Sequence, residues 1–462
     1  MTSPGGFQAE PRGASLIPMQ TSQFTTNDLR TLSLWLLAAV IGLYVAVQYH
    51  DQAFPSASIE FKISRSDAEA QAMAFLRQQD FAPETYRAVT VFDYDDHAKV
   101  YLERELGLAR ADSVMRQDVS IWRWRSRFYR PSEQEEFSVS LSPGGQLVGF
   151  NHEIEEAREG LSLDQISARK IAESFLTEHR DRDLSEYQLI EGDTRERANR
   201  TDHSFTWERR EFQAKEATAR IAITVQGDRV GHYSEFLKVP EAWRRDYAQL
   251  RSRNMLMQEV TQSAFFAIIL AMLVMLVIGL GRRRLTYRFG AQCGGALALC
   301  SLALTLNTLP LAFVQYDTTQ SLGSFYSSFI FGALVSACGW LVYITLAGAV
   351  SVSAYRSELP EKIAPEFLVN RETLRSKEYL MSCLVGYLIP LIMLGYITGF
   401  YVIGADYGVW SPTAISYTDL ASTALPWLYP LTIGLMASIS EEFIFRMFAI
   451  PFLKRHLKST FL

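Results

Sequence analysis

Two adjacent glutamates and an arginine lie in an apolar stretch near the end of the sequence, at Glu441, Glu442 and Arg446. Charged groups in a spanning helix are costly and are rarely retained without a partner or a task. Glu442 and Arg446 are four residues apart, so a helix places them on one face, where they can form an ion pair. Glu441 has Ala437 and Phe445 one turn away instead of a basic residue. A carboxylate without a counter-ion in a low-dielectric setting is suited to proton transfer. The alternative is a purely structural ion pair, with Glu441 reaching cytoplasmic water.

The motif "EEFIFR", followed by "MFAIPFL" in an apolar helix, resembles the first motif of the CAAX prenyl protease and bacteriocin-processing (CPBP, Abi) family of intramembrane proteases. The similarity covers residues 379–462. It implies a membrane bundle that hydrolyses peptide bonds of a peptide or protein substrate. By motif position, Glu441 would be the general base that activates water, and Glu442 would be held by Arg446. The resemblance leaves open whether a divalent metal such as zinc takes part.

The same resemblance implies two histidine motifs on later helices, the first of them Phe-x-x-x-His. Phe452 to His456 fits that pattern, but His456 lies about 22 Å beyond Glu441 along a continuous helix, too far for both to touch one water. We therefore interpret His456 as a juxtamembrane residue and rank it last among the candidate catalytic residues. The chain is expected to be the front part of an intramembrane protease, inactive without later motif helices; the alternative is a natural remnant without activity.

Six apolar segments must position these residues, and each is long enough to cross the hydrocarbon of a bilayer. They are predicted at residues 32–47, 262–281, 289–313, 325–353, 379–404 and 426–450. The first is interpreted as an anchor, because polar residues rather than a cleavage site follow it; a cleaved signal sequence is the alternative.

Basic residues alternate between the loops that connect these segments. They gather in the loops after residues 281 and 353 and after residue 453, whereas residues 314–324 and 405–425 contain no lysine or arginine. The positive-inside rule then places the N-terminus in the cytoplasm and residues 51–261 outside it, in a multi-pass protein of the cell (inner) membrane. All four cysteines lie in predicted spans, so the block outside the membrane has none for a disulfide.

The block between the first two spans contains an internal similarity. Residues at matching helical spacing, i, i+4, i+7 and i+8, predict two amphipathic helices with the same apolar face; they are Ala68, Ala72, Phe75 and Leu76, and Ala168, Ala172, Phe175 and Leu176. Each predicted helix is followed by a strand pair around a glycine turn, at Gly144-Gly145 and at Gly227-Asp228. Two α+β units in tandem result, and this order of elements resembles PepSY-type modules beside bacterial membrane peptidases.

The predicted fold is a multi-span all-α membrane bundle of about six helices with an inserted extracytoplasmic α+β domain made of two similar units. The expected boundaries are a cytoplasmic leader at 1–30, an anchor at 31–50, the units at 51–157 and 158–260, and the membrane domain at 261–462. A net charge of −5 without an extended basic face argues against nucleic acid as a partner. The lipid bilayer is an expected partner, and the outer domain could bind an extracytoplasmic peptide or protein. The alternative function is a non-catalytic membrane sensor that uses this domain.

Overall fold

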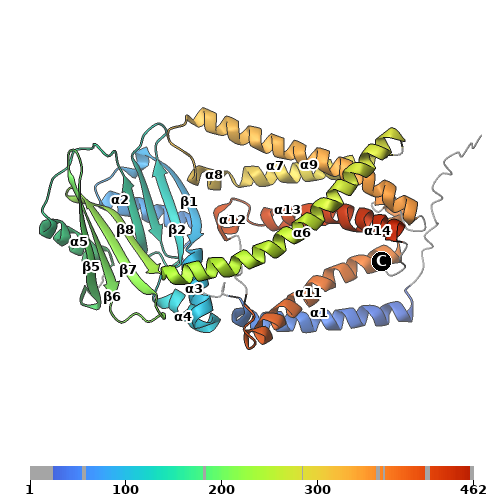
Figure 1. Ribbon diagram of the computed structural model, residues 1–462, viewed down its shortest axis with the longest axis horizontal. Coiled ribbons are helices and arrows are strands. Elements are labelled where there is room, and N and C mark those ends of the chain that lie inside the picture. Colours follow the sequence, from blue (N-terminus) through green and yellow to red (C-terminus); the bar gives the residue numbers. More distant parts are fainter. Residues whose placement is uncertain are drawn as a thin grey trace, which may run out of the picture. The chain divides into compact units, whose positions relative to one another are not determined.

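The structure is a computed structural model that describes residues 24–54, 59–180, 184–283, 285–359, 365–367, 370–410 and 417–457. The predicted leader at 1–30 lies mostly outside the described residues. The chain divides into two compact parts, which are described separately. One, the helical pair, combines residues 1–50 with 359–407; the other, the main body, combines residues 51–358 with 408–462 (Figure 1).

The helical pair consists chiefly of α1 (Thr26–Ala53) and α11 (Lys377–Ala405), with the short η4 (Pro365–Phe367) and α10 (Arg371–Leu374) before α11. The two long helices approach closely at Gly42 and Gly395, where a Cβ built on Gly395 would lie 2.3 Å from the Gly42 Cα. Only glycine permits that backbone separation. Near one end of the pair, Lys377 Nζ donates to Asp28 Oδ2 at 2.9 Å, which holds the two helices in register.

The main body begins with an eight-stranded antiparallel sheet whose strand order is β1-β2-β3-β4-β8-β7-β6-β5. The strands are β1 (Arg87–Tyr94), β2 (Trp122–Tyr129), β3 (Glu136–Leu141), β4 (Leu147–Glu153), β5 (Tyr187–Glu196), β6 (Thr201–Arg209), β7 (Thr218–Gln226) and β8 (Arg229–Lys238). The last strands of the two halves pair with each other, with Phe150 opposite Tyr233. The two halves therefore share one sheet. We call this sheet and the helices that pack on it the sheet domain.

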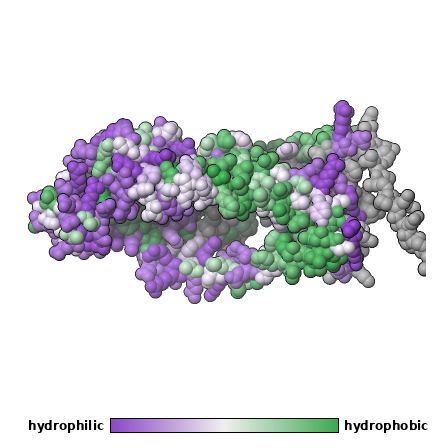
Figure 2. All heavy atoms as spheres, turned by 90° about the horizontal axis from the view of Figure 1, so that it is seen from above, coloured by the Kyte–Doolittle hydropathy of each residue, from purple (hydrophilic) through white to green (hydrophobic). Residues whose placement is uncertain are grey.

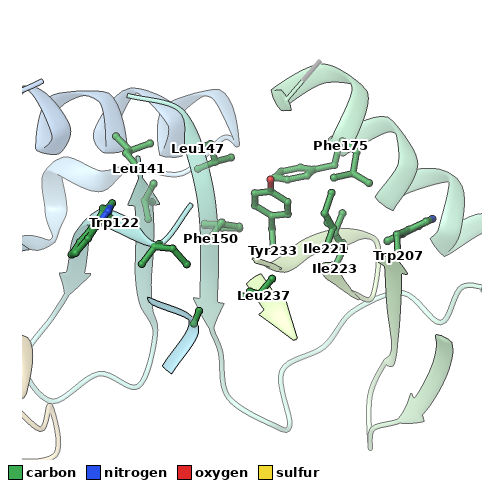
Figure 3. Packing of buried hydrophobic residues seen from close by; sticks show 14 of the residues in the cluster. Trp122, Leu141, Leu147, Phe150, Phe175, Trp207, Ile221, Ile223, Tyr233 and Leu237 are labelled. Carbon is green, nitrogen blue, oxygen red and sulfur yellow. The ribbon is translucent and has the colours of Figure 1, made fainter. Parts of the chain in front are cut away.

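Helices α2 (Arg65–Gln78) and α5 (Gln165–Arg180) cover one face of this sheet. The eight residues predicted as their shared apolar faces are all buried, with exposed fractions of 0 to 7%. Phe75 packs edge-on against Phe150, Phe175 contacts Tyr233, and the two helix phenylalanines meet at 6.3 Å. Figure 3 shows Phe150 from the first half with Phe175 and Tyr233 from the second, and all three belong to one core. Burial of this continuous apolar core is the main source of stability for a domain without disulfides.

The two halves differ in one insertion. The first has α3 (Asp96–Leu106) and α4 (Leu108–Gln117) between β1 and β2, in addition to the turn η2 (Pro83–Thr85); in the second, only the turn η3 (Leu184–Glu186) precedes β5. On α3, Lys99 Nζ lies 3.2 Å from Glu103 Oε1, and both side chains are buried. Burial raises the pKa of Glu103 to about 6, with Lys99 opposing the shift.

Within the described residues, five helices are long and apolar enough to cross a membrane: α1, α6 (Glu241–Gly281), α7 (Arg288–Asn307), α9 (Leu322–Glu358) and α11. Figure 2 shows apolar residues gathered over the long helices and hydrophilic residues over the sheet domain. The predicted span 289–313 is divided, because α7 ends at Asn307 and α8 (Leu309–Val314) follows. The predicted sixth span is also divided, into α13 (Leu428–Glu441), η5 (Glu442–Ala449) and α14 (Ile450–Leu457), preceded by the short α12 (Tyr417–Ser422).

Candidate functional site

The glutamates lie where an α-helix changes into a π-helix. Glu441 is the last residue of α13, and Glu442 is the first residue of η5, an eight-residue π-helix. The sequence predicted an ordinary α-helix here. π-Helices are rare and occur frequently at functional sites. We call α13 and η5 together the motif helix.

One face of η5 is packed and the other is open. The packed face is buried among α6, α7 and α9 through Phe443, Ile444, Met447, Phe448 and Ala449. Glu441 and Arg446 are exposed, and Glu442 is half-buried. The polar groups therefore project away from the packed core of the described helices.

The ion pair expected from the four-residue spacing is present. Arg446 Nη1 lies 2.8 Å from Glu442 Oε1, and the two side chains are 71% and 45% exposed. Both side chains lie on the face of η5 that the described helices leave unpacked, so those helices do not enclose the pair. Glu441 has no ion-pair partner within the described part of the chain.

A buried hydroxyl from another helix supports the π-helix. Ser351 of α9, fully buried, donates to the Phe443 carbonyl at 2.7 Å. Where a helix widens from the α to the π pattern, its carbonyls no longer all find the usual backbone donor, and an orphaned buried carbonyl is costly. Ser351 supplies a donor at that point, so the unusual helix is stabilised by a specific contact.

Tyr355, one turn further along α9, lies within electrostatic range of both Glu442 and Arg446. It belongs to the partly buried residues that pack against the core beside Phe443. Tyr355 could not be predicted from the sequence, because the link between α9 and the motif exists only in three dimensions.

His456 lies elsewhere. Its Nδ1 donates to the Phe452 carbonyl at 2.7 Å. The ring lines a pocket of about 120 Å³ bounded by α6, α9 and α14, together with Arg455 and Glu358, which are 3.8 Å apart. Neither Glu441 nor Glu442 lines this pocket. The structure therefore does not bring His456 together with the carboxylates, in agreement with the distance argument from the sequence.

A metal centre would need several histidine, cysteine or carboxylate ligands around one point. Among the described residues, no group of three or more such side chains could hold a metal ion. The two glutamates of the motif and His456 do not form such a set. The described residues therefore do not fit a bound zinc ion.

The fold and the site define a protein with a sheet domain of two similar halves and several helices long enough to span a membrane. Residues 103–234 match a family model described as the YcdB, YcdC repeated domain (DUF4901). The matched stretch runs from the end of α3 into β8, so it draws on both halves of the sheet domain. No curated protein matches the chain, and no solved structure matches it. The likeness to PepSY modules stays a prediction.

Proposed function

We propose that the chain is part of an intramembrane endopeptidase of the CAAX prenyl protease type, and that Glu441 is its general base. The observation that carries the proposal is the π-helical turn of the motif. It pairs Glu442 with Arg446 at 2.8 Å and leaves the adjacent Glu441 exposed beside that pair. One carboxylate is thereby neutralised, and the other is available for proton transfer.

In the proposed reaction, Glu441 takes a proton from a water molecule while the hydroxyl oxygen attacks the carbonyl carbon of the scissile peptide. The C–N bond then breaks, and the proton held by Glu441 passes to the leaving amine. General acid–base catalysis of this kind contributes about 10²–10⁴-fold to a rate. Stabilisation of the oxyanion would need hydrogen-bond donors beside Glu441.

The proposed topology places the motif near the cytoplasmic face. Arg282 and Arg283 follow the end of α6, and Arg356 lies in the last turn of α9. Lys454 and Arg455 lie in the last turn of α14. Under the positive-inside rule these ends are cytoplasmic, and the sheet domain, which precedes the other end of α6, is extracytoplasmic.

The test uses the full native polypeptide in proteoliposomes, with two fluorogenic peptides: one ending in a farnesylated CAAX sequence and its unprenylated counterpart. Glu441→Gln keeps the size of the side chain and removes the base. The matched control is Glu372→Gln, which makes the same change at an exposed carboxylate of α10. We expect the first variant to lose at least about 100-fold in cleavage rate and the control to cleave at the wild-type rate.

Cleavage by Glu441→Gln at the wild-type rate would remove this residue from the mechanism. The non-catalytic sensor would then be the remaining functional prediction for the chain.

A further inference from the structure

The sheet domain holds the segment that leads into the motif helix. The backbone N–H of Phe92 donates to Ser422 Oγ at 2.8 Å, and Arg65 Nη1 donates to the Ser422 carbonyl at 2.6 Å. Ser422 ends α12 and is fully buried. Because β1 is an edge strand, its outward N–H groups lack a neighbouring strand, and Ser422 satisfies one of them.

A second pair of hydrogen bonds lies three residues further on. Leu425 N donates to Asn307 Oδ1, and Asn307 Nδ2 donates to the Leu425 carbonyl, both at 3.0 Å. Asn307 is the last residue of α7 and is buried. The segment 422–425 is therefore tied to the sheet domain at one end and to α7 at the other, directly before α13 begins at Leu428.

The sheet domain also holds α8, the helix that follows α7. Arg127 Nη1 donates to the carbonyls of Phe313, Val314 and Tyr316 at 3.2, 3.0 and 2.7 Å. A guanidinium at the C-terminal end of a helix is favourable for the helix dipole as well as for the orphaned carbonyls. The main body thus contains two independent polar attachments between the sheet and the segments next to the motif helix.

The motif helix is fixed at its far end as well. α13 packs on α7, and η5 packs on α9, where Ser351 bonds the Phe443 carbonyl. From Leu428 to Glu441 the helix rises about 20 Å, with Pro430 in its first turn and Gly434 in its middle. Because α13 is continuous over these residues, the segment 422–425 determines where the helix that carries Glu441 begins.

We propose that Ser422 is a positioning residue through which the sheet domain sets the place of Glu441. The effect on cleavage rests on the proposed function of Glu441, whereas the effect on the motif helix does not. Loss of the Ser422 hydroxyl removes its hydrogen bond with the Phe92 N–H of β1, which loosens the start of the motif helix.

The experiment compares Ser422→Ala, Ser422→Thr and the control Ser33→Ala in the full native chain. Among the described residues, Ser33 Oγ bonds only the carbonyl of Leu29 within its own helix. Amide hydrogen exchange of residues 428–449 reports on the motif helix, and exchange of β2 to β4 reports on whether the sheet domain stays folded. We expect exchange in 428–449 to rise about tenfold in Ser422→Ala, to stay within about threefold of wild type in Ser422→Thr, which keeps the hydroxyl, and to be unchanged in Ser33→Ala.

Cleavage of the farnesylated peptide is the second measurement. We expect Ser422→Ala to lower kcat with little change in KM, because it displaces the base rather than the peptide-binding surface, and Ser422→Thr to restore kcat. If exchange rises in Ser422→Ala but Glu441→Gln still cleaves, the positioning role stands and the proposed catalytic function fails.

Wild-type exchange in Ser422→Ala would overturn the inference. If that variant also unfolds β2 to β4, Arg65→Gln replaces it, since this change removes only the bond to the Ser422 carbonyl. Faster exchange in 428–449 of Arg65→Gln, with β2 to β4 protected, supports the inference, and unchanged exchange overturns it.

Discussion

The buried pair of Lys99 and Glu103 predicts a specific pH dependence of the stability of the sheet domain. Burial raises the pKa of Glu103 from 4.5 to about 6, and the negative charge of Asp96 adds to this shift. The folded state therefore binds a proton more tightly than the unfolded chain does. Stability from this group is fully present below pH 4.5 and is lost as the pH rises through 6. A shift of that size corresponds to about 2 kcal/mol.

The perturbation is the double variant Lys99→Met with Glu103→Leu, which replaces the pair by apolar side chains suited to a helix. Replacing both partners avoids leaving either charge buried alone. Urea unfolding of the full chain in detergent, followed by tryptophan fluorescence at pH 4.5 and at pH 7, gives the free energy of unfolding of variant and wild type. Trp122, Trp124 and Trp207 all lie in the sheet domain.

Other titrating groups affect both proteins equally, so the difference between them isolates this pair. We expect the variant to gain about 2 kcal/mol relative to wild type between pH 4.5 and pH 7. The matched control removes Glu241 and Arg245, an exposed pair on α6. The free energy of unfolding of this control should differ from that of wild type by the same amount at both pH values. If the free energies of unfolding of the Lys99→Met, Glu103→Leu variant and of wild type differ by the same amount at pH 4.5 and at pH 7, the reasoning is refuted.

Three further predictions concern the helices. Ser351→Ala removes the hydroxyl that supports η5 and should lower the free energy of unfolding by about 1 kcal/mol, with faster hydrogen exchange in 442–449. Arg446→Ala leaves Glu442 without its counter-ion in a segment proposed to lie in the membrane, where an unpaired carboxylate is costly; it should lower the Tm in lipid nanodiscs, and Arg446→Met with Glu442→Gln should recover most of that loss. Gly42→Leu should separate α1 from α11, because a Cβ at Gly42 would lie 2.6 Å from the Leu391 carbonyl oxygen; an introduced disulfide between the two helices that still forms would contradict this.

Local patterns predicted α2 and α5 because burial repeats at the helical period, whereas α3 and α4 were not predicted. Ala68 and Leu76, like Ala168 and Leu176, are completely buried. The hairpins around Gly145 and Gly227 were predictable for the same kind of reason, since both glycines have a positive φ that their turns require. The pairing of β4 with β8 was not, because strands from different halves meet through contacts that no local spacing encodes.

The ion pair of the candidate site was predictable from the spacing of Glu442 and Arg446 in the sequence, and the π-helix was not. An α-helix and a π-helix both bring residues four apart to one side, so the pattern of Glu442 and Arg446 is compatible with either. The difference depends on Ser351, which lies 92 residues earlier in the chain. The extent of α6 was also missed, because its first twenty residues are polar and only the remainder has the apolar composition of a span.

α6 continues from the sheet domain to the end of its apolar segment as one helix of 41 residues, about 60 Å long. Its beginning is anchored by Trp243, whose Nε1 donates to Glu105 at 2.7 Å. Further along, Phe265 meets Phe445 of η5. Such a rod acts as a lever: a tilt of one degree about its anchor moves its far tip by about 1 Å. A small tilt of α6 about Trp243 would therefore displace Phe265, beside η5 and the glutamates, by a fraction of a bond length.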